Sequence, residues 1–218
     1  NTMRLFFEYN AKILIFFICL VLGGGDAYGE QPKARKTLIV IDPGHGGVDI
    51  GAKVKLIKEK NLALKTANLV RQILHKKGYS VILTRSKDVF TSLGKRVDIA
   101  NDTKSHLFVS IHYNAFKNTS IEGIEVYYYN KGVKKRKSSS KKLADTVLGE
   151  MILKTKAKSR GVKAGNYHVI RETNMPAILI EGGFLTNPNE YIALLDKTYI
   201  EKIAESIASG IDKFLKNK

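Results

Sequence analysis

The chain has 218 residues and an apolar fraction of 44%, which suffices for one globular domain with a substantial core and argues against an intrinsically disordered protein. The excess of 37 Lys and Arg over 20 Asp and Glu gives a formal net charge of +17, which suits contact with an anionic membrane or an acidic polymer, or a surface that is simply rich in lysine. The single cysteine, Cys19, excludes intrachain disulfides and metal sites built from several thiolates.

The N-terminal segment over 1–29 has the features of an export signal. Arg4 precedes an apolar stretch over 13–22 that is short for a membrane-spanning helix, and the small residues at 27 and 29 suit a signal peptidase. An uncleaved N-terminal anchor is the alternative. We expect a protein exported to the periplasm or cell envelope, which meets no nucleic acid and touches the membrane only through this segment. Cleavage would also remove Cys19, which excludes a catalytic thiol.

A basic linker is expected over 30–36, and one globular domain over 37–218. Near-continuous apolar runs predict strands buried on both faces at 38–41, 81–84, 107–111 and 177–180, and a β-prone run predicts an edge strand at 123–129. Apolar residues at helical spacing predict helices at 61–77, 93–101, 141–154 and 199–214. This alternation predicts an α/β fold with a mixed, mostly parallel, twisted sheet of about six strands flanked by helices. The basic run over 131–142 is expected to be a mobile, solvated loop.

Two of the predicted strands end at histidines. The first runs into Asp42-Pro43-Gly44-His45-Gly46-Gly47, where the glycines allow a tight turn that leaves the imidazole of His45 free at the carboxyl edge of the sheet. The strand at 107–111 runs directly into His112. Ligand sites of open α/β sheets lie at this edge, so the two side chains can converge on one metal ion. A structural role in a turn is the alternative for either histidine alone.

Two carboxylates complete the candidate site. Glu59 lies at the start of the predicted helix over 61–77 and suits the third ligand of a hydrolytic zinc site, although it would equally complement the helix dipole. Glu181 follows the apolar strand at 177–180, where an ionised side chain is costly unless it is used or paired. We therefore expect Glu181 to act as a general base.

The ordered set of motifs resembles the zinc-dependent N-acetylmuramoyl-L-alanine amidases of the cell-wall amidase type 3 family. The matching segments occur in family order from Thr37 to the C-terminus, and they are 41–47, 59–60, 83–85, Arg96 with 100–101, 110–115, 160–162 and 175–185. Any one of these segments is a weak signal, whereas the ordered set is highly specific.

The resemblance implies that His45, Glu59 and His112 hold one zinc ion and that Glu181 is the catalytic carboxylate. It further implies hydrolysis of the amide between the lactyl group of N-acetylmuramic acid and L-alanine, in peptidoglycan or its muropeptide fragments. A role in cell division or wall recycling, and an activator or divisome partner, are implied by the family only. Arg96 and Asn114 also match, and we expect them to pair a carboxylate or close a turn.

Three other interpretations stay open. Ser138 with Lys141, and Ser139 with Lys142, fit the serine-x-x-lysine spacing of penicillin-sensitive D-Ala carboxypeptidases, although a segment rich in both residue types contains such spacings by chance. A catalytically silent peptidoglycan-binding scaffold is a second interpretation, against which the retention of all four site residues argues. A zinc hydrolase acting on another amide is the third.

Overall fold

The computed structural model describes residues 37–217. The predicted export signal over 1–29 and the linker over 30–36 lie outside the described residues. Between 37 and 217 the structure contains no helix that is both long and apolar enough to cross a membrane. The described residues therefore correspond to the predicted domain over 37–218, without its last residue.

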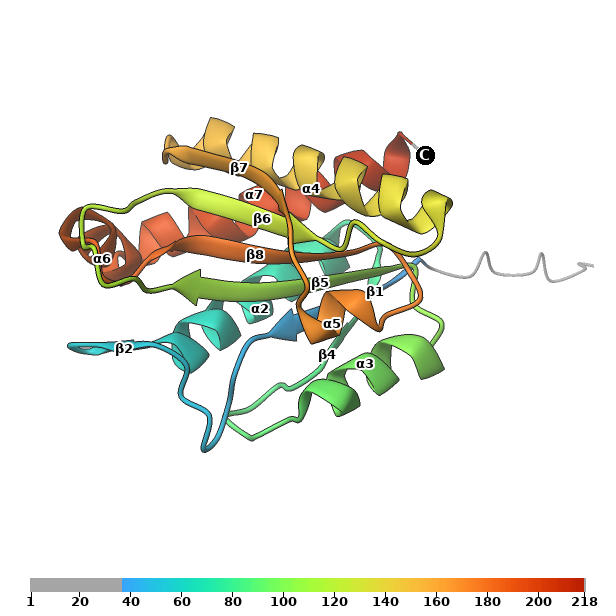
Figure 1. Cartoon of the computed structure of the whole chain (residues 1–218), viewed down its shortest axis with the longest axis horizontal. Helices are drawn as coiled ribbons and strands as arrows, with labels where there is room; N and C mark the ends of the chain where they lie inside the picture. The colour runs from blue at the N-terminus through green and yellow to red at the C-terminus, as the bar shows by residue number, and fades with distance from the viewer. Residues whose placement is uncertain (1–36, 218) are drawn as a thin grey trace, which may run out of the picture. The chain divides into compact units, whose positions relative to one another are not determined.

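A six-stranded sheet forms the centre of this domain. Its strands are β1 (Leu38–Pro43), β4 (Ser80–Leu83), β5 (Leu107–Asn114), β6 (Ile124–Tyr128), β7 (Ser159–Ala164) and β8 (Ala177–Phe184). They lie in the spatial order β4-β1-β5-β8-β6-β7 (Figure 1). The first four run parallel, whereas β6 is antiparallel to β8 and carries β7 parallel to itself. The predicted mixed, mostly parallel sheet is confirmed.

Helices cover both faces of the sheet. They are α2 (Glu59–Lys76), α3 (Leu93–Asp102), α4 (Lys134–Thr155), α5 (His168–Arg171), α6 (Pro188–Leu195) and α7 (Lys197–Lys216). The apolar faces of α2, α4 and α7 pack on one side and share a large core with β1, β5 and β8. Helices α3 and α5 lie on the opposite face and cover only part of it (Figure 1). A smaller core fills the space between these two helices and the sheet. A short hairpin, β2 (Lys53–Val54) and β3 (Ile57–Lys58), leads directly into α2.

The prediction of a mobile loop over 131–142 was wrong, because α4 begins at Lys134. The guanidinium of Arg136 donates hydrogen bonds to the backbone carbonyls of Met175 and Arg171 at 3.0 and 3.2 Å. The Oγ of Ser140 is buried and accepts a hydrogen bond from the backbone of Ala177. These long-range contacts fix the first turns of α4 on the segment that enters β8, although the local sequence is strongly basic.

The prediction of an edge strand over 123–129 was also wrong. β6 lies inside the sheet, between β8 and β7. The edge position belongs to β7, which was not predicted because its sequence, Ser-Arg-Gly-Val-Lys-Ala, has no apolar run and is half-exposed. A strand with few apolar side chains forms here because its backbone pairs with β6.

A buried ion pair holds the loop that follows β1. Asp42 is only 1% exposed, and its carboxylate accepts hydrogen bonds from Arg96 at 2.6 Å, Thr84 at 2.5 Å and Ser110 at 2.7 Å. Arg96 also donates to the backbone carbonyl of His45 at 2.7 Å. Burial alone would raise the pKa of Asp42, but the charge of Arg96 and the three hydrogen-bond donors hold it below 3.8. The ion pair therefore couples α3 to the loop that carries His45.

Loss of this carboxylate should destabilise the domain. Asp42→Asn leaves the guanidinium of Arg96 buried without its counter-charge, so the free energy of unfolding should fall by about 3–5 kcal/mol in urea titrations. Because the folded-state pKa of Asp42 is depressed, its contribution is present above pH 3.8 and is lost as the pH falls through the folded-state value. The control is Glu172→Gln, which removes an exposed partner of Arg171 and should leave the unfolding curve unchanged. Equal behaviour of the two variants would contradict this account of the buried pair.

Candidate metal centre

The loop after β1 presents the imidazole of His45 with one defined nitrogen facing inward. His45 has a φ of 58°, in the left-handed region that non-glycine residues rarely adopt. Its Nδ1 lies 2.9 Å from both carboxylate oxygens of Asp49, four residues later. Its Nε2 faces Glu59, 3.0 Å from Oε1. With Nδ1–H donating to Asp49, Nε2 carries the free lone pair that a metal ion requires.

His112 reaches the same point from β5. Its Nδ1 lies 2.9 Å from Oε1 of Glu59, and its ring meets that of His45 edge-on, with centroids 4.9 Å apart. The backbone of Gly44 packs directly on this ring, because a Cβ at Gly44 would lie 2.3 Å from the His112 Cε1 atom. A residue without a side chain is therefore required at position 44 for the imidazole to occupy this place.

Glu59, at the first position of α2, joins the two histidines. Its carboxylate is buried, and Oε1 lies between the two imidazole nitrogens while Oε2 accepts a hydrogen bond from the backbone of Ala52 at 2.9 Å. Burial would raise the pKa of Glu59, but the hydrogen bonds and charges of His112 and His45 outweigh it and hold the pKa far below its usual range. Glu59 is thus a permanent anion at the helix N-terminus.

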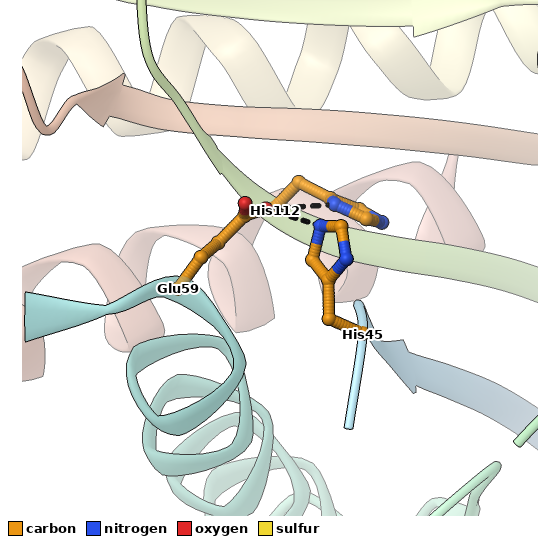
Figure 2. Close-up of side chains that lie close together, drawn as sticks. All are labelled: His45, Glu59 and His112. Atoms are coloured by element: carbon orange, nitrogen blue, oxygen red, sulfur yellow. Dashed lines mark hydrogen bonds and ion pairs between the residues drawn. The ribbon is translucent and has the colours of Figure 1, made fainter. Parts of the chain in front are cut away.

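These three side chains fit a metal ion. Their ligand atoms, two imidazole nitrogens and one carboxylate oxygen, all lie within 4.8 Å of one another. Figure 2 shows the side chains converging from the β1 loop, the start of α2 and the end of β5. Two nitrogens and an oxygen are a donor set that suits divalent zinc and neighbouring transition metals. The structure thus brings together the three residues that the sequence predicted as metal ligands.

Glu181 lines the same cleft as these three candidate ligands. It is the register partner of His112 across β5 and β8, and both residues line a cleft of about 400 Å³ together with Glu59 and His45. Glu181 is 9% exposed, and its Oε2 has no hydrogen-bond partner among the described residues. Burial, and then the nearby charges of Glu59 and Glu125, raise the pKa of Glu181 well above 4.5. A carboxyl group whose pKa is raised in this way is suited to taking up and releasing a proton.

Arg96 and Asn114 make contacts of the kind expected from the sequence. Arg96 pairs with the carboxylate of Asp42, as described above. Asn114 donates from Nδ2 to Oε1 of Glu125 at 3.2 Å, and its Oδ1 accepts a hydrogen bond from the backbone of Ala115. Both residues therefore support the walls of the site.

The serine and lysine pairs lie on α4. Ser138 and Lys141 are exposed, and the ammonium of Lys141 is held by Asp145 at 2.8 Å. Lys142, the partner of Ser139 in the sequence pattern, donates instead to the backbone carbonyl of Asn217. Neither lysine contacts a serine hydroxyl among the described residues. No contact therefore favours a nucleophilic serine here.

Sequence reasoning missed several residues that border the site. Asp49 could have been found from its position four residues after His45, within the same turn. Glu125 could not, because its neighbours come from three different strands: Asn114, Tyr127, Arg160 and Lys163 all donate to its carboxylate. Without the antiparallel pairing of β6 with β8, nothing in the sequence places Glu125 beside Glu181.

The close contact between Gly44 and His112 leads to a stability prediction. Gly44→Ala should lower the free energy of unfolding by about 1–3 kcal/mol, because the added methyl group overlaps the imidazole ring. Gly149→Ala is the matched control, since its Cβ would meet nothing within 4 Å in the middle of α4. That variant should raise the free energy by about 0.5–1 kcal/mol. Urea unfolding of both variants measures the difference, and the same sign for both would refute the packing argument.

Similar proteins found by sequence and similar structures found by fold are both amidases. A probable cell wall amidase, LytH of Staphylococcus epidermidis, is 34% identical over 188 residues, which cover 85% of this chain and 60% of the relative. The chain thus spans about 60% of the length of the curated relatives that it matches first. The crystal structure of an N-acetylmuramoyl-L-alanine amidase from Clostridium difficile 630 superposes with a TM-score of 0.79 at 40% identity, over 84% of this chain and 98% of that one.

A second solved structure, the CwlD amidase of Clostridioides difficile in complex with the GerS lipoprotein, has a TM-score of 0.77 at 33% identity, over 84% of this chain and all of that one. The family model for N-acetylmuramoyl-L-alanine amidase matches residues 39–213, nearly the whole described domain with its candidate ligands and Glu181. On this match, and on the fold that it shares with the solved amidases, the chain belongs to the N-acetylmuramoyl-L-alanine amidase family.

Proposed function

We propose that the chain is a zinc-dependent peptidoglycan hydrolase that cuts the amide between the lactyl group of N-acetylmuramic acid and L-alanine. The observation that carries the proposal is that a His-Glu-His donor set meets the buried Glu181 in one cleft, where Oε2 of Glu181 has no hydrogen-bond partner within residues 37–217. Membership of the amidase family supports this substrate class.

His45, Glu59 and His112 would hold the ion. When bound in a site of this kind, zinc polarises the scissile carbonyl and makes water acidic enough to attack it at neutral pH. Asp49 fixes the tautomer and orientation of His45 through Nδ1, which is the usual support for an imidazole ligand. The hydrogen bond from the backbone of Ala52 keeps the carboxylate of Glu59 in place.

Glu181 moves the proton. Its carboxylate takes one proton from the attacking water as the oxygen bonds to the carbonyl carbon, and it delivers that proton to the nitrogen of L-alanine as the carbon–nitrogen bond breaks. Glu181 suits both halves of this transfer, because burial raises its pKa while no group in the described part of the chain donates a hydrogen bond to its Oε2. The same residue therefore serves as base and then as acid.

The location and the partner are part of the proposal. An amidase of this specificity acts on the cell wall, as the name of the staphylococcal relative states for that protein, and the predicted export signal over 1–29 would bring the chain to the envelope or periplasm. A similar amidase has been seen with a lipoprotein partner, so an activator protein for this chain is a natural extension of the proposal. The net charge of +17 favours an anionic wall surface.

Removal of the metal should abolish the reaction. Digestion of purified peptidoglycan by residues 30–218 should release stem peptides beginning with L-alanine, seen by mass spectrometry, and a chelator should stop the release until zinc is restored. Zinc at about 100 times its dissociation constant should stabilise the fold by about 2.7 kcal/mol. Glu59→Gln should lose this stabilisation, whereas the control His75→Ala, which alters an exposed histidine on α2, should keep it. Release of only terminal D-alanine, unaffected by chelator, would instead favour the serine–lysine chemistry.

Glu181→Gln should separate metal binding from catalysis. The variant keeps the shape of the side chain and loses the proton acceptor, so the rate of peptide release should fall by about 10²- to 10⁴-fold. Zinc-dependent stabilisation of the fold should be retained, because Glu181 is not one of the three ligands. Normal turnover by this variant would exclude Glu181 as the base.

A further inference from the structure

A second cluster of charged side chains lies beside the cleft, on the part of the sheet formed by β6 and β7. Its centre is Glu125, which is only 2% exposed and is the register partner of Glu181 across β6 and β8. Partners in register project from the same face of a sheet, so Glu125 lies on the face that carries the candidate metal centre. Asn114, which lines the cleft, donates to Oε1 of Glu125 at 3.2 Å and makes the two groups of residues contiguous.

Two cations share the other oxygen of this carboxylate. Oε2 of Glu125 accepts hydrogen bonds from Nε of Arg160 at 2.9 Å and from Nζ of Lys163 at 2.5 Å. Burial alone would raise the pKa of Glu125, but the donors Lys163, Tyr127 and Arg160 outweigh burial and lower it. Glu125 is therefore ionised, and the two cations Arg160 and Lys163 face this one buried anion.

The side chain of Arg160 is fixed in place with its outer donors free. A bulge in β7 sets two residues, Arg160 and Gly161, opposite the single Glu125 of β6. The guanidinium lies 5.0 Å over the ring of Phe184, and its stem packs on Gly123, where a Cβ would come within 2.9 Å of the arginine Cγ. Within residues 37–217 the two terminal amino groups of Arg160 donate to no acceptor, and the side chain is 29% exposed.

A guanidinium held in this way is a preorganised site for a carboxylate. Two parallel N–H donors match the two oxygens of a carboxylate, and little conformational entropy is lost on binding because Glu125, Phe184 and Gly123 already fix the side chain. The anchor on Glu125 uses only Nε, so the bidentate edge of Arg160 stays available. Such a site recognises an anionic group of the substrate.

The distance to the reacting centre suits the peptide side of the substrate. β7 lies two strand spacings, about 10 Å, from β8, where Glu181 would act. An extended peptide advances about 3.5 Å per residue, so a group one residue beyond L-alanine lies about 7 Å from the scissile amide. The remaining distance is within the reach of an arginine side chain. Tyr167, which lines the cleft and meets the ring of Tyr127 at 5.0 Å, borders this path.

We propose that Arg160, positioned by Glu125, binds the free carboxylate of the stem-peptide residue that follows L-alanine and so makes the enzyme prefer acidic over amidated stem peptides. The inference rests on the proposed amidase function and adds the peptide specificity of the same cleft. Lys163 contributes a second positive charge without the paired donors, and Glu125 acts as a positioning residue.

A competition digest tests this assignment. The substrate is peptidoglycan in which the second stem residue is partly D-glutamate with a free α-carboxylate and partly its α-amide, and mass spectrometry follows the two released peptides in one reaction. The initial ratio of products reports the ratio of kcat/KM for the two forms. The wild-type chain should release the acidic peptide about 10- to 100-fold faster, as expected for hydrogen bonds to a charged group. Arg160→Gln should bring the ratio close to one by slowing release of the acidic peptide.

Two further variants separate binding from folding and from simple loss of charge. Arg160→Lys keeps a cation beside Glu125 but loses the paired donors, so its preference should fall while its thermal unfolding stays near that of the wild type. Lys158→Gln removes an exposed positive charge two residues earlier and should leave the preference unchanged. Among residues 37–217, the ammonium of Lys158 forms an ion pair with Glu122 alone, at 3.8 Å.

The outcomes distinguish this assignment from the proposed function. A wild-type ratio near one, or a ratio that Arg160→Gln leaves unchanged, overturns the role of Arg160 while the amidase activity stands. Release of neither peptide by the wild-type chain overturns both. Equal slowing of the two peptides in Arg160→Gln would make the residue a structural support only.

Discussion

The buried ion pair between Asp42 and Arg96 is the constraint on which the rest of the site depends. Asp42 ends the apolar part of β1, and Arg96 comes from α3, on the face of the sheet that carries the smaller core. Arg96 uses its remaining donors on the backbone carbonyls of Thr91, Pro43 and His45, so one side chain connects the sheet, the helix and a candidate metal ligand. Burying such a pair is expensive in desolvation, and its value here is in fixing one geometry of the loop more than in net stability.

The cleft holds two carboxylates whose surroundings push their pKa values apart. Glu59 lies between two imidazoles and stays ionised, whereas Glu181 is buried near two other carboxylates and its pKa rises. This separation suits a permanent anionic ligand and a group that exchanges a proton. The two residues are of one type, so their different roles come from what surrounds them. Glu59 also begins α2, where its negative charge is favourable to the helix dipole, so ligand position and helix start are specified by one residue.

Strands β6 and β7, which run opposite to the other four strands, extend the site beyond β8. The candidate metal ligands His45 and His112 lie at the carboxyl ends of the parallel strands β1 and β5, the edge at which open α/β sheets bind ligands. Because β6 and β7 run in the opposite direction, their first residues lie at that same edge. This reversal places Glu125 beside Glu181, and it places Arg160 and Lys163 of the next strand against Glu125. The sheet therefore provides the candidate metal centre from one half and the proposed substrate-binding surface from the other.

The sequence by itself determined the α/β class, most strands and helices, and the four residues of the candidate centre. It could do so because apolar runs that end at His45, His112 and Glu181 are local patterns, and parallel strands necessarily share their carboxyl edge. Only the tertiary structure decided that the basic run at 131–142 begins a helix, that β7 is a strand, and that Glu125 gathers Arg160 and Lys163. Each of these features depends on partners far away in the chain. The start of α4 depends on the backbone carbonyls that accept hydrogen bonds from Arg136, and β7 depends on pairing with the backbone of β6. The position of Arg160 against Glu125 depends on the bulge in β7. Local composition carries no information on such contacts, because their free energy arises only when the separate elements pack together.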